Sequence, residues 1–164
     1  MQENGWLGLD GSRVLVAGAG GIGTACAIGY AQQGAAVFLV DRDGDRVASA
    51  IEAVQEAAPD AKVAGLDIDL TESDSGARAV DRALTTIGGL DVALHAIGVN
   101  DRRPLIEFSR EEWESIQRVN LGSAFEIVQA AGRHFVEQKR GLHGSGCAPQ
   151  HRVSRTAARA HRRR

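Results

Sequence analysis

The chain has 164 residues, of which 43% are hydrophobic and 24% are charged, and its formal net charge is −2. These values indicate a single soluble globular domain with a sizeable core, and no apolar stretch approaches the length of a membrane span. The N-terminus lacks the layout of a secretory signal, and Cys26 and Cys147 cannot form a disulfide framework, so we expect a reduced, cytoplasmic setting.

The charge is unevenly distributed. Residues 1–140 contain all 21 acidic and 13 of the 19 basic residues, whereas residues 141–164 contain six arginines and no acid. Segments of such different chemistry rarely share one structural role. We therefore divide the chain into a domain over residues 1–140 and a basic, disordered tail over residues 141–164.

The first predicted strand, residues 13–17, is apolar throughout, as a strand covered on both faces should be. It runs into Gly18, Gly20 and Gly23, which have the G-x-G-x-x-G spacing, and then into a helix over residues 21–33. In this pattern the glycines allow a tight turn, close approach of a pyrophosphate, and close packing of the helix on the strand. The pattern therefore predicts a phosphate site at the helix N-terminus.

The middle of the chain repeats the alternation of strand and helix. We expect strands at residues 35–40, 61–66 and 90–97, and helices at residues 43–58 and from about Thr71 to Gly88. Thr71 is the expected N-cap, and Ala77, Val80 and Leu84 are the expected inward residues of that helix. This order predicts an α/β fold with a doubly wound parallel sheet of about four strands.

A capping box, Ser109 to Glu112, opens a long predicted helix over residues 109–139, which Gly122 or Gly132 could bend. After it the pattern of alternating elements stops. Residues 141–164 have no run of four to eight apolar residues, so we expect no strand there and an exposed edge at residues 91–97. Their composition also suggests out-of-frame translation of a GC-rich gene, and a natural short paralogue is the alternative.

Five segments in this order resemble the N-terminal half of a short-chain dehydrogenase/reductase. The turn from Gly18 to Gly23 is similar to the family's T-G-x-x-x-G-x-G, one residue shorter and with Ala17 in place of threonine. The other four are Asp41 after the second strand, Asp69-Leu70, His95-Ala96-Ile97-Gly98 in place of N-N-A-G, and Val119-Asn120-Leu121.

The resemblance implies a Rossmann-like domain that binds a nicotinamide dinucleotide, NAD rather than NADP because Asp41 would repel a 2′-phosphate. It also implies a small alcohol or carbonyl substrate for an intact member. The implied cofactor-binding residues are Gly18, Gly20, Gly21, Ile22, Gly23, Asp41, Arg42, Asp69, Leu70, His95, Ala96 and Gly98.

The family's other catalytic groups are absent from this sequence. It has one tyrosine, Tyr30, with glycine four residues later, so there is no Y-x-x-x-K, and no strand is expected to position a downstream serine. Asn120 matches the asparagine of the family's catalytic tetrad, but without these partners its role would be vestigial. We therefore interpret the chain as a catalytically incomplete fragment of an oxidoreductase.

Each of these residues also has a purely structural interpretation. Asp41 could cap the following turn, Asp69 could precede a helix near Thr71, and Asn120 could bridge a kink. A single histidine at a strand end, such as His95, is more often a hydrogen-bonded structural group than a catalyst.

Other functions remain open. The chain could be a non-catalytic dinucleotide-binding protein or a scaffold with an arginine-rich interaction tail, and the helix 109–139 could mediate homo-oligomerisation. Because Gly141, Gly144, Gly146 and Pro149 disfavour a helix that would align His143, Cys147 and His151, we expect no metal site. We also expect no specific nucleic-acid recognition and no membrane association.

Overall fold

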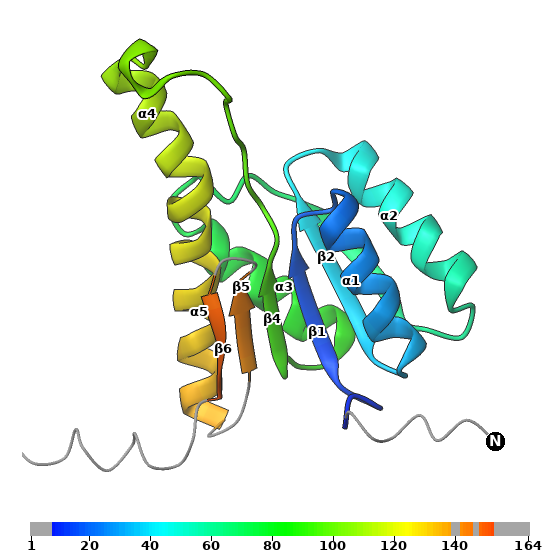
Figure 1. Cartoon of the computed structure of the whole chain (residues 1–164). Helices are drawn as coiled ribbons and strands as arrows, with labels where there is room; N and C mark the ends of the chain where they lie inside the picture. Colours follow the sequence, from blue (N-terminus) through cyan, green and yellow to red (C-terminus); the bar gives the residue numbers. More distant parts are fainter. Residues whose placement is uncertain (1–7, 139–141, 146–147, 153–164) are drawn as a thin grey trace, which may run out of the picture.

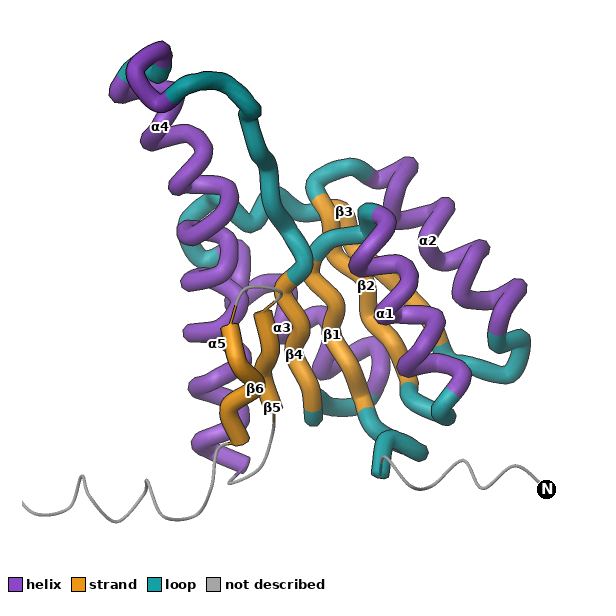
Figure 2. The backbone as a smooth tube through the Cα atoms, viewed as in Figure 1, coloured by secondary structure: helices purple, strands orange, loops and turns teal. Residues whose placement is uncertain are grey.

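The computed structural model describes residues 8–138, 142–145 and 148–152. In this part of the chain, helices cover both faces of a central sheet (Figures 1 and 2). The strands are β1 (Arg13–Ala17), β2 (Ala36–Asp41), β3 (Val63–Asp67), β4 (Val92–His95), β5 (Leu142–Ser145) and β6 (Ala148–Arg152). The helices are α1 (Gly21–Gln32), α2 (Gly44–Ala57), α3 (Ser75–Ile87), η1 (Leu105–Glu107), α4 (Arg110–Gln117), η2 (Arg118–Gly122) and α5 (Ser123–Gln138).

The sheet has the order β3-β2-β1-β4-β5-β6, and β1 to β4 form parallel ladders with their neighbours. This arrangement confirms the predicted Rossmann-like parallel sheet. The chain runs outward from β1 through β2 to β3 and then returns to β4 on the other side of β1. This reversal between β1 and β4 is the topological switch point at which open α/β sheets bind ligands. The glycine turn leaves β1 at this point.

The core has two layers because side chains along a strand alternate between the faces of the sheet. Val14 and Val16 of β1 pack on the side of α1 and α2, whereas Leu15 and Ala17 pack on the side of α3 and α5. All four are fully buried. Both faces of the strand are thus apolar, which explains why its sequence shows no polar alternation.

Helix α1 packs on the sheet through small residues. Its buried residues are Gly23, Ala27 and Ala31, whereas Ile22 is 74% exposed. The sequence pattern places the larger side chains of this helix on one side. That side is not the face that packs on the sheet. Small residues at the contact bring the helix axis close to β1.

The N-cap of helix α3 lies three residues later than predicted, so the expected capping role of Thr71 is wrong. Asp74 is its N-cap residue and adopts a left-handed conformation, with φ of 60°. Thr71 instead lies in a turn, where it donates to Asp69. The shift also changes the inward face, since Ala77 is exposed while Val80 is buried.

The predicted long helix is present as α4 and α5 joined by the π-helical turn η2, and its capping box at Ser109 and Glu112 is confirmed. The π turn contains Gly122 and Asn120. It adds backbone to the helix without ending it, and π turns of this kind often lie at functional sites.

The expectation that no strand follows residue 140 is wrong for residues 142–145 and 148–152. Strand β5 pairs in parallel with β4, and β6 pairs antiparallel with β5, so residues 91–97 do not form the edge of the sheet. Main-chain hydrogen bonds form such a ladder whatever the side chains are. Strands without an apolar run therefore leave no apolar pattern in the sequence from which they could be predicted. The predicted disorder of the remaining tail falls on residues outside the described part.

The amino ends of the strands are held together by an ion pair. The Arg13 guanidinium donates to both carboxylate oxygens of Asp91, at 2.7 and 2.9 Å, and to the Gly88 carbonyl at 2.8 Å. These bonds raise the pKa of Arg13. They link β1 to the segment that leads into β4, at the end of the sheet opposite the glycine turn.

We predict that Gly76→Ala destabilises the chain by about 1–3 kcal/mol, because overpacking forces neighbouring backbone apart. A Cβ at Gly76 would lie 2.1 Å from the Glu126 carbonyl oxygen, so α3 and α5 would have to separate. Urea denaturation measures the effect. The control is Gly132→Ala in α5, where nothing lies within 4 Å of an added Cβ and a gain of up to about 1 kcal/mol is expected. Equal stability of the two variants would contradict this packing argument.

Candidate functional site

The glycine turn combines two tightly packed glycines with two open ones. Gly18 has φ of +108°, and a Cβ there would lie 2.9 Å from the Ala96 backbone. A Cβ on Gly23 would lie 1.7 Å from the Gly18 carbonyl oxygen. By contrast, nothing lies within 4 Å of an added Cβ at Gly20 or Gly21. The fold thus requires the first and last glycines, and the middle two leave free space over the backbone.

The N-terminus of α1 opens onto this space. Gly20 is its N-cap residue, no side chain caps it, and its first turn contains no acidic residue. The first amide groups of a helix have no partners within the helix and carry the positive end of its dipole. A phosphate group would satisfy them, and Ile22, in this first turn, is exposed.

Asp41 at the end of β2 ties the glycine turn to the neighbouring loop. Its carboxylate accepts from the Ala19 amide at 2.8 Å and from the Asp43 amide at 3.1 Å. The second bond is the turn-capping contact of the structural interpretation, and the first brings the carboxylate beside the turn. Each oxygen keeps a further lone pair, so Asp41 can still accept from hydroxyl groups of a ligand.

Asp69 forms a local turn. Its carboxylate accepts from the Thr71 amide and hydroxyl, each at 2.8 Å, and these bonds, aided by the charge of Arg42, hold the pKa of Asp69 below its usual value. The carboxylate is therefore ionised at neutral pH. The structural interpretation placed Asp69 just before a helix, but it lies in a turn, since α3 begins only at Ser75.

Asn120 joins the π turn to the loop after β4. Its side-chain oxygen accepts from the Val99 amide at 2.7 Å, and its side-chain nitrogen donates to the Val99 carbonyl at 2.8 Å. Asn120 is exposed, and its side chain bridges the helix to this loop and does not span a kink within the helix. It holds the segment from Ala96 to Val99 against the helix.

His95 is a buried, hydrogen-bonded group at the end of β4. Its Nε2 lies 2.8 Å from the Ser123 hydroxyl, and only 5% of the residue is exposed. Burial lowers the pKa of His95, so the ring is neutral at neutral pH. The ring lies behind the strand end and does not line the cleft described next.

A cleft of about 130 Å³ lies at the carboxyl ends of β1, β2 and β4. Eight of the twelve predicted cofactor residues line it, and Gly21, Ile22, Gly23 and His95 do not. The other lining residues were not predicted, although Ile97 and Val119 belong to two of the segments that carry the family resemblance. Of the residues predicted to bind a cofactor, those that line it are Gly18, Gly20, Asp41, Arg42, Asp69, Leu70, Ala96 and Gly98, and the additional lining residues are Arg46, Ile68, Thr71, Ile97, Val99, Val119 and Ser123.

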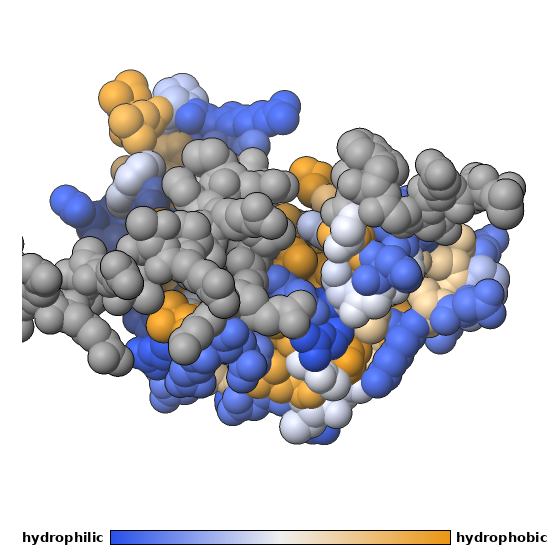
Figure 3. Space-filling model, turned by 90° about the horizontal axis from the view of Figure 1, so that it is seen from below, coloured by the Kyte–Doolittle hydropathy of each residue, from blue (hydrophilic) through white to orange (hydrophobic). Residues whose placement is uncertain are grey.

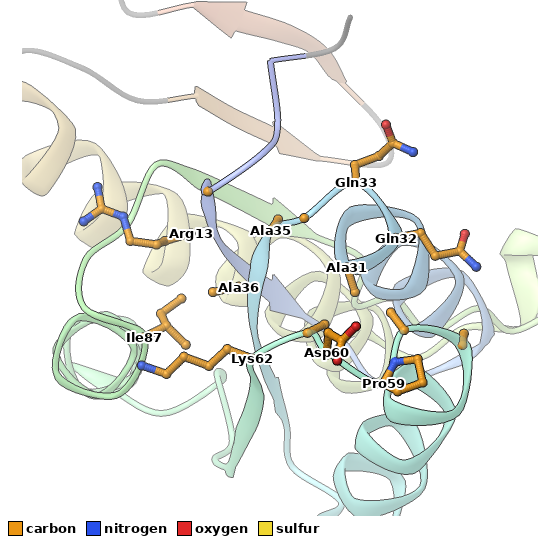
Figure 4. A pocket seen from close by; sticks show the side chains of 15 residues that line it. Arg13, Ala31, Gln32, Gln33, Ala35, Ala36, Pro59, Asp60, Lys62 and Ile87 are labelled. Carbon is orange, nitrogen blue, oxygen red and sulfur yellow. The ribbon is translucent and has the colours of Figure 1, made fainter. Parts of the chain in front are cut away.

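A larger hollow, of about 920 Å³, lies at the opposite end of the sheet. Arg13, Lys62 and Ile87 lie on one side of it and Pro59 and Asp60 on the other (Figure 4). Figure 3 views this end of the molecule, where apolar residues are surrounded by hydrophilic ones. Helices end here with their carbonyl groups, and the amino ends of parallel strands are not where such sheets bind ligands. Size alone therefore does not make this hollow the functional site.

The described residues contain neither a metal-binding cluster nor a membrane-spanning helix. No group of three or more histidine, cysteine, aspartate or glutamate side chains is arranged to hold a metal ion there. No described helix is both long and apolar enough to span a bilayer. The side chains of the three metal ligands considered from the sequence, His143, Cys147 and His151, lie outside the described part.

Comparisons with known proteins agree with this geometry. The family model described as short chain dehydrogenase matches residues 12–142. Gluconate 5-dehydrogenase of Gluconobacter oxydans (strain 621H) is 33% identical over 151 residues, covering 90% of this chain and 57% of that protein. 5-Keto-D-gluconate 5-reductase of Escherichia coli (strain K12) is 31% identical over 153 residues, covering 93% and 59%.

The crystal structure of a short-chain type dehydrogenase/reductase from Mycobacterium marinum has the same arrangement of elements. It matches with a TM-score of 0.78 at 27% sequence identity, covering 88% of this chain and 62% of that one. This chain therefore spans somewhat more than half the length of the proteins that it matches.

We predict that Asn120→Ala loosens the loop after β4 and lowers stability by about 1 kcal/mol, because two exposed hydrogen bonds to Val99 are lost. Amide hydrogen exchange should become faster at Val99, and urea denaturation gives the stability. Ser115→Ala, at an exposed position on α4, is the control and should change neither quantity. An unchanged exchange rate at Val99 would show that the bridge does not hold the loop.

Proposed function

The chain belongs to the short-chain dehydrogenase family, and from that premise we propose that it binds a nicotinamide dinucleotide in the cleft at the carboxyl ends of its parallel strands. Members of this family bind NAD or NADP. The observation that carries the proposal is the open space over Gly20 and Gly21 beside the uncapped N-terminus of α1. A group with negative charge, such as a pyrophosphate, complements that end of a helix.

We further propose that the cofactor is NAD rather than NADP. The cleft contains the Asp41 carboxylate, which can accept from ribose hydroxyls and would repel a 2′-phosphate. Arg42 and Arg46 also line the cleft, but Arg46 pairs with Asp43 at 3.2 Å and the charge of Arg42 acts on Asp69. The cations are thus partly balanced by neighbouring acids, which supports a preference for NAD.

The proposed reaction of an intact member is hydride transfer between a nicotinamide and the carbon of an alcohol or carbonyl substrate. When bound, the dinucleotide supplies the hydride or accepts it, and a protein group must handle the proton. This sequence has no Y-x-x-x-K, and both polar atoms of the Asn120 side chain are occupied by Val99. We therefore propose that this chain by itself binds the cofactor without turning over a substrate.

A second candidate is a non-catalytic dinucleotide-binding or scaffold protein with an arginine-rich interaction tail, in a cytoplasmic setting. It is favoured by the missing proton donor and by the six arginines without any acid in residues 141–164. Both candidates share the same cleft. They differ in whether a longer or completed chain would have activity.

We also propose that the face of α5 associates with a second copy of the chain. Phe125 and Val136 are 59% and 65% exposed, and Leu121 in the π turn is 65% exposed. Apolar side chains gathered along one helix favour association with another surface, since contact removes them from water.

We predict that calorimetric titration detects NAD binding, with NADP weaker by at least about tenfold, and that no alcohol is oxidised. Gly20→Val should weaken NAD binding by more than about tenfold, because the new side chain would fill the space over the turn. Its fold should persist, since Gly20 has φ of −77°, which valine readily adopts.

The matched control is Gly29→Val, in the same helix, where an added Cβ also meets nothing within 4 Å. This variant should bind NAD like the unchanged chain. Absence of NAD binding to a folded chain would overturn the proposal, and oxidation of alcohols would overturn the claim that the chain is catalytically incomplete.

We predict that the chain self-associates and that Phe125→Glu shifts it toward the monomer, because a charge would be buried at the contact. Sedimentation velocity measures the distribution. Gln55→Glu, at an exposed position on α2, is the control and should leave it unchanged. A monomeric chain at high concentration would refute this interface.

A further inference from the structure

Asp43, two residues after the end of β2, divides its carboxylate oxygens between a helix end and a cation. Its Oδ1 accepts from the Asp45 and Arg46 amides, at 3.1 and 3.2 Å, and these bonds cap α2. Its Oδ2 lies 3.2 Å from Nε of the Arg46 guanidinium. Because the two amide bonds fix the carboxylate, the same residue also orients the Arg46 side chain.

Arg46 lies between two adjoining hollows. It lines the cleft at the carboxyl ends of the strands, and it also lines a second hollow of about 290 Å³ at the beginnings of α1 and α2. Ala19, Thr24 and Ser49 line this second hollow as well. The Ala19 amide donates to Asp41 at 2.8 Å, so the second hollow begins beside the carboxylate that is proposed to accept from the ribose.

The second hollow leaves room for a phosphate on the 2′ oxygen of a ribose bound at Asp41. Its volume of about 290 Å³ is roughly ten times the space that one water molecule takes in the liquid. Arg46 lines both hollows, whereas Arg42 lines the cleft and its charge acts on Asp69. Charge at Arg46, and not lack of space, therefore decides whether a 2′-phosphate is held here.

We propose that Asp43 is a specificity-determining residue, which disfavours NADP because its carboxylate neutralises Arg46. The inference rests on the proposed cofactor site and names the pair of residues that strengthens its preference for NAD. A guanidinium without an anionic partner would form charge-assisted hydrogen bonds to a 2′-phosphate. With Asp43 in place, Arg46 already has an anionic partner, and a phosphate that approaches it is repelled by the same carboxylate.

The exposure of this ion pair sets the size of the expected effect. The side chains of Arg46 and Asp43 are 64% and 43% exposed, and water and salt weaken ion pairs at such positions. We therefore expect Asp43 to change NADP affinity by about fivefold, which is less than a buried pair would give. Asp41 remains in the cleft, so NAD should stay the preferred dinucleotide even without the charge of Asp43.

The test measures NAD and NADP affinities by calorimetry in the unchanged chain and in Asp43→Asn. Asparagine caps a helix about as well as aspartate does but has no charge, so α2 should persist, and urea denaturation checks this. We expect NADP affinity to rise about fivefold relative to NAD affinity. The matched control is Glu52→Gln, which removes one charge at an exposed position further along α2 and should leave the ratio unchanged.

A second variant shows whether Asp43 acts through Arg46. In a chain that already carries Arg46→Gln, Asp43→Asn should no longer raise NADP affinity, because no guanidinium is left to release. An NADP affinity that does not change in Asp43→Asn, or that rises equally without Arg46, would overturn the inference and leave the proposed cofactor site standing if NAD binds. If neither dinucleotide binds to the folded chain, the proposed site fails and this inference fails with it.

Discussion

The candidate site depends on the close approach of three backbone segments at the carboxyl end of β1. A Cβ on Gly18 would lie 2.9 Å from the Ala96 backbone, and one on Gly23 would lie 1.7 Å from the Gly18 carbonyl oxygen. Any side chain at these positions would push α1 or β4 away from the turn. Since α1 also rests on the sheet through small residues, the same constraint brings its N-terminal amides to the switch point of the sheet.

Polar side chains then hold the surrounding loops in place, and most of them act through backbone groups. Asp41 accepts from the Ala19 amide, Asn120 bonds both polar groups of Val99, and Ser123 bonds the Val119 carbonyl. The bonds of Asp41 and Asn120 join different elements at the edge of the cleft, and that of Ser123 lies within the helical run of η2 and α5. The cleft is thus held open before any ligand enters, which reduces the entropy lost on binding.

The sequence was sufficient to predict the parts of this arrangement that depend on local chemistry. The strand over residues 13–17, the capping box at Ser109 and the parallel order of the first four strands follow from apolar runs, spacing and alternation. The π turn was not predictable, because its extra residue leaves the apolar periodicity almost unchanged. Likewise, the start of α3 depends on a left-handed Asp74, which no pattern in the sequence indicates.

Contacts between residues far apart in the sequence are a second part of the site that the sequence did not predict. His95 was predicted as a lining residue because of its position in a motif, yet it lies behind the cleft and acts on Ser123, 28 positions away. Contacts over such separations cannot be derived from one chain's spacing. In this chain the strand end bears an imidazole ring, hydrogen-bonded to Ser123, where the resemblance has an amide side chain. The cleft therefore depends on the backbone geometry of the glycine turn and on a side-chain contact behind it.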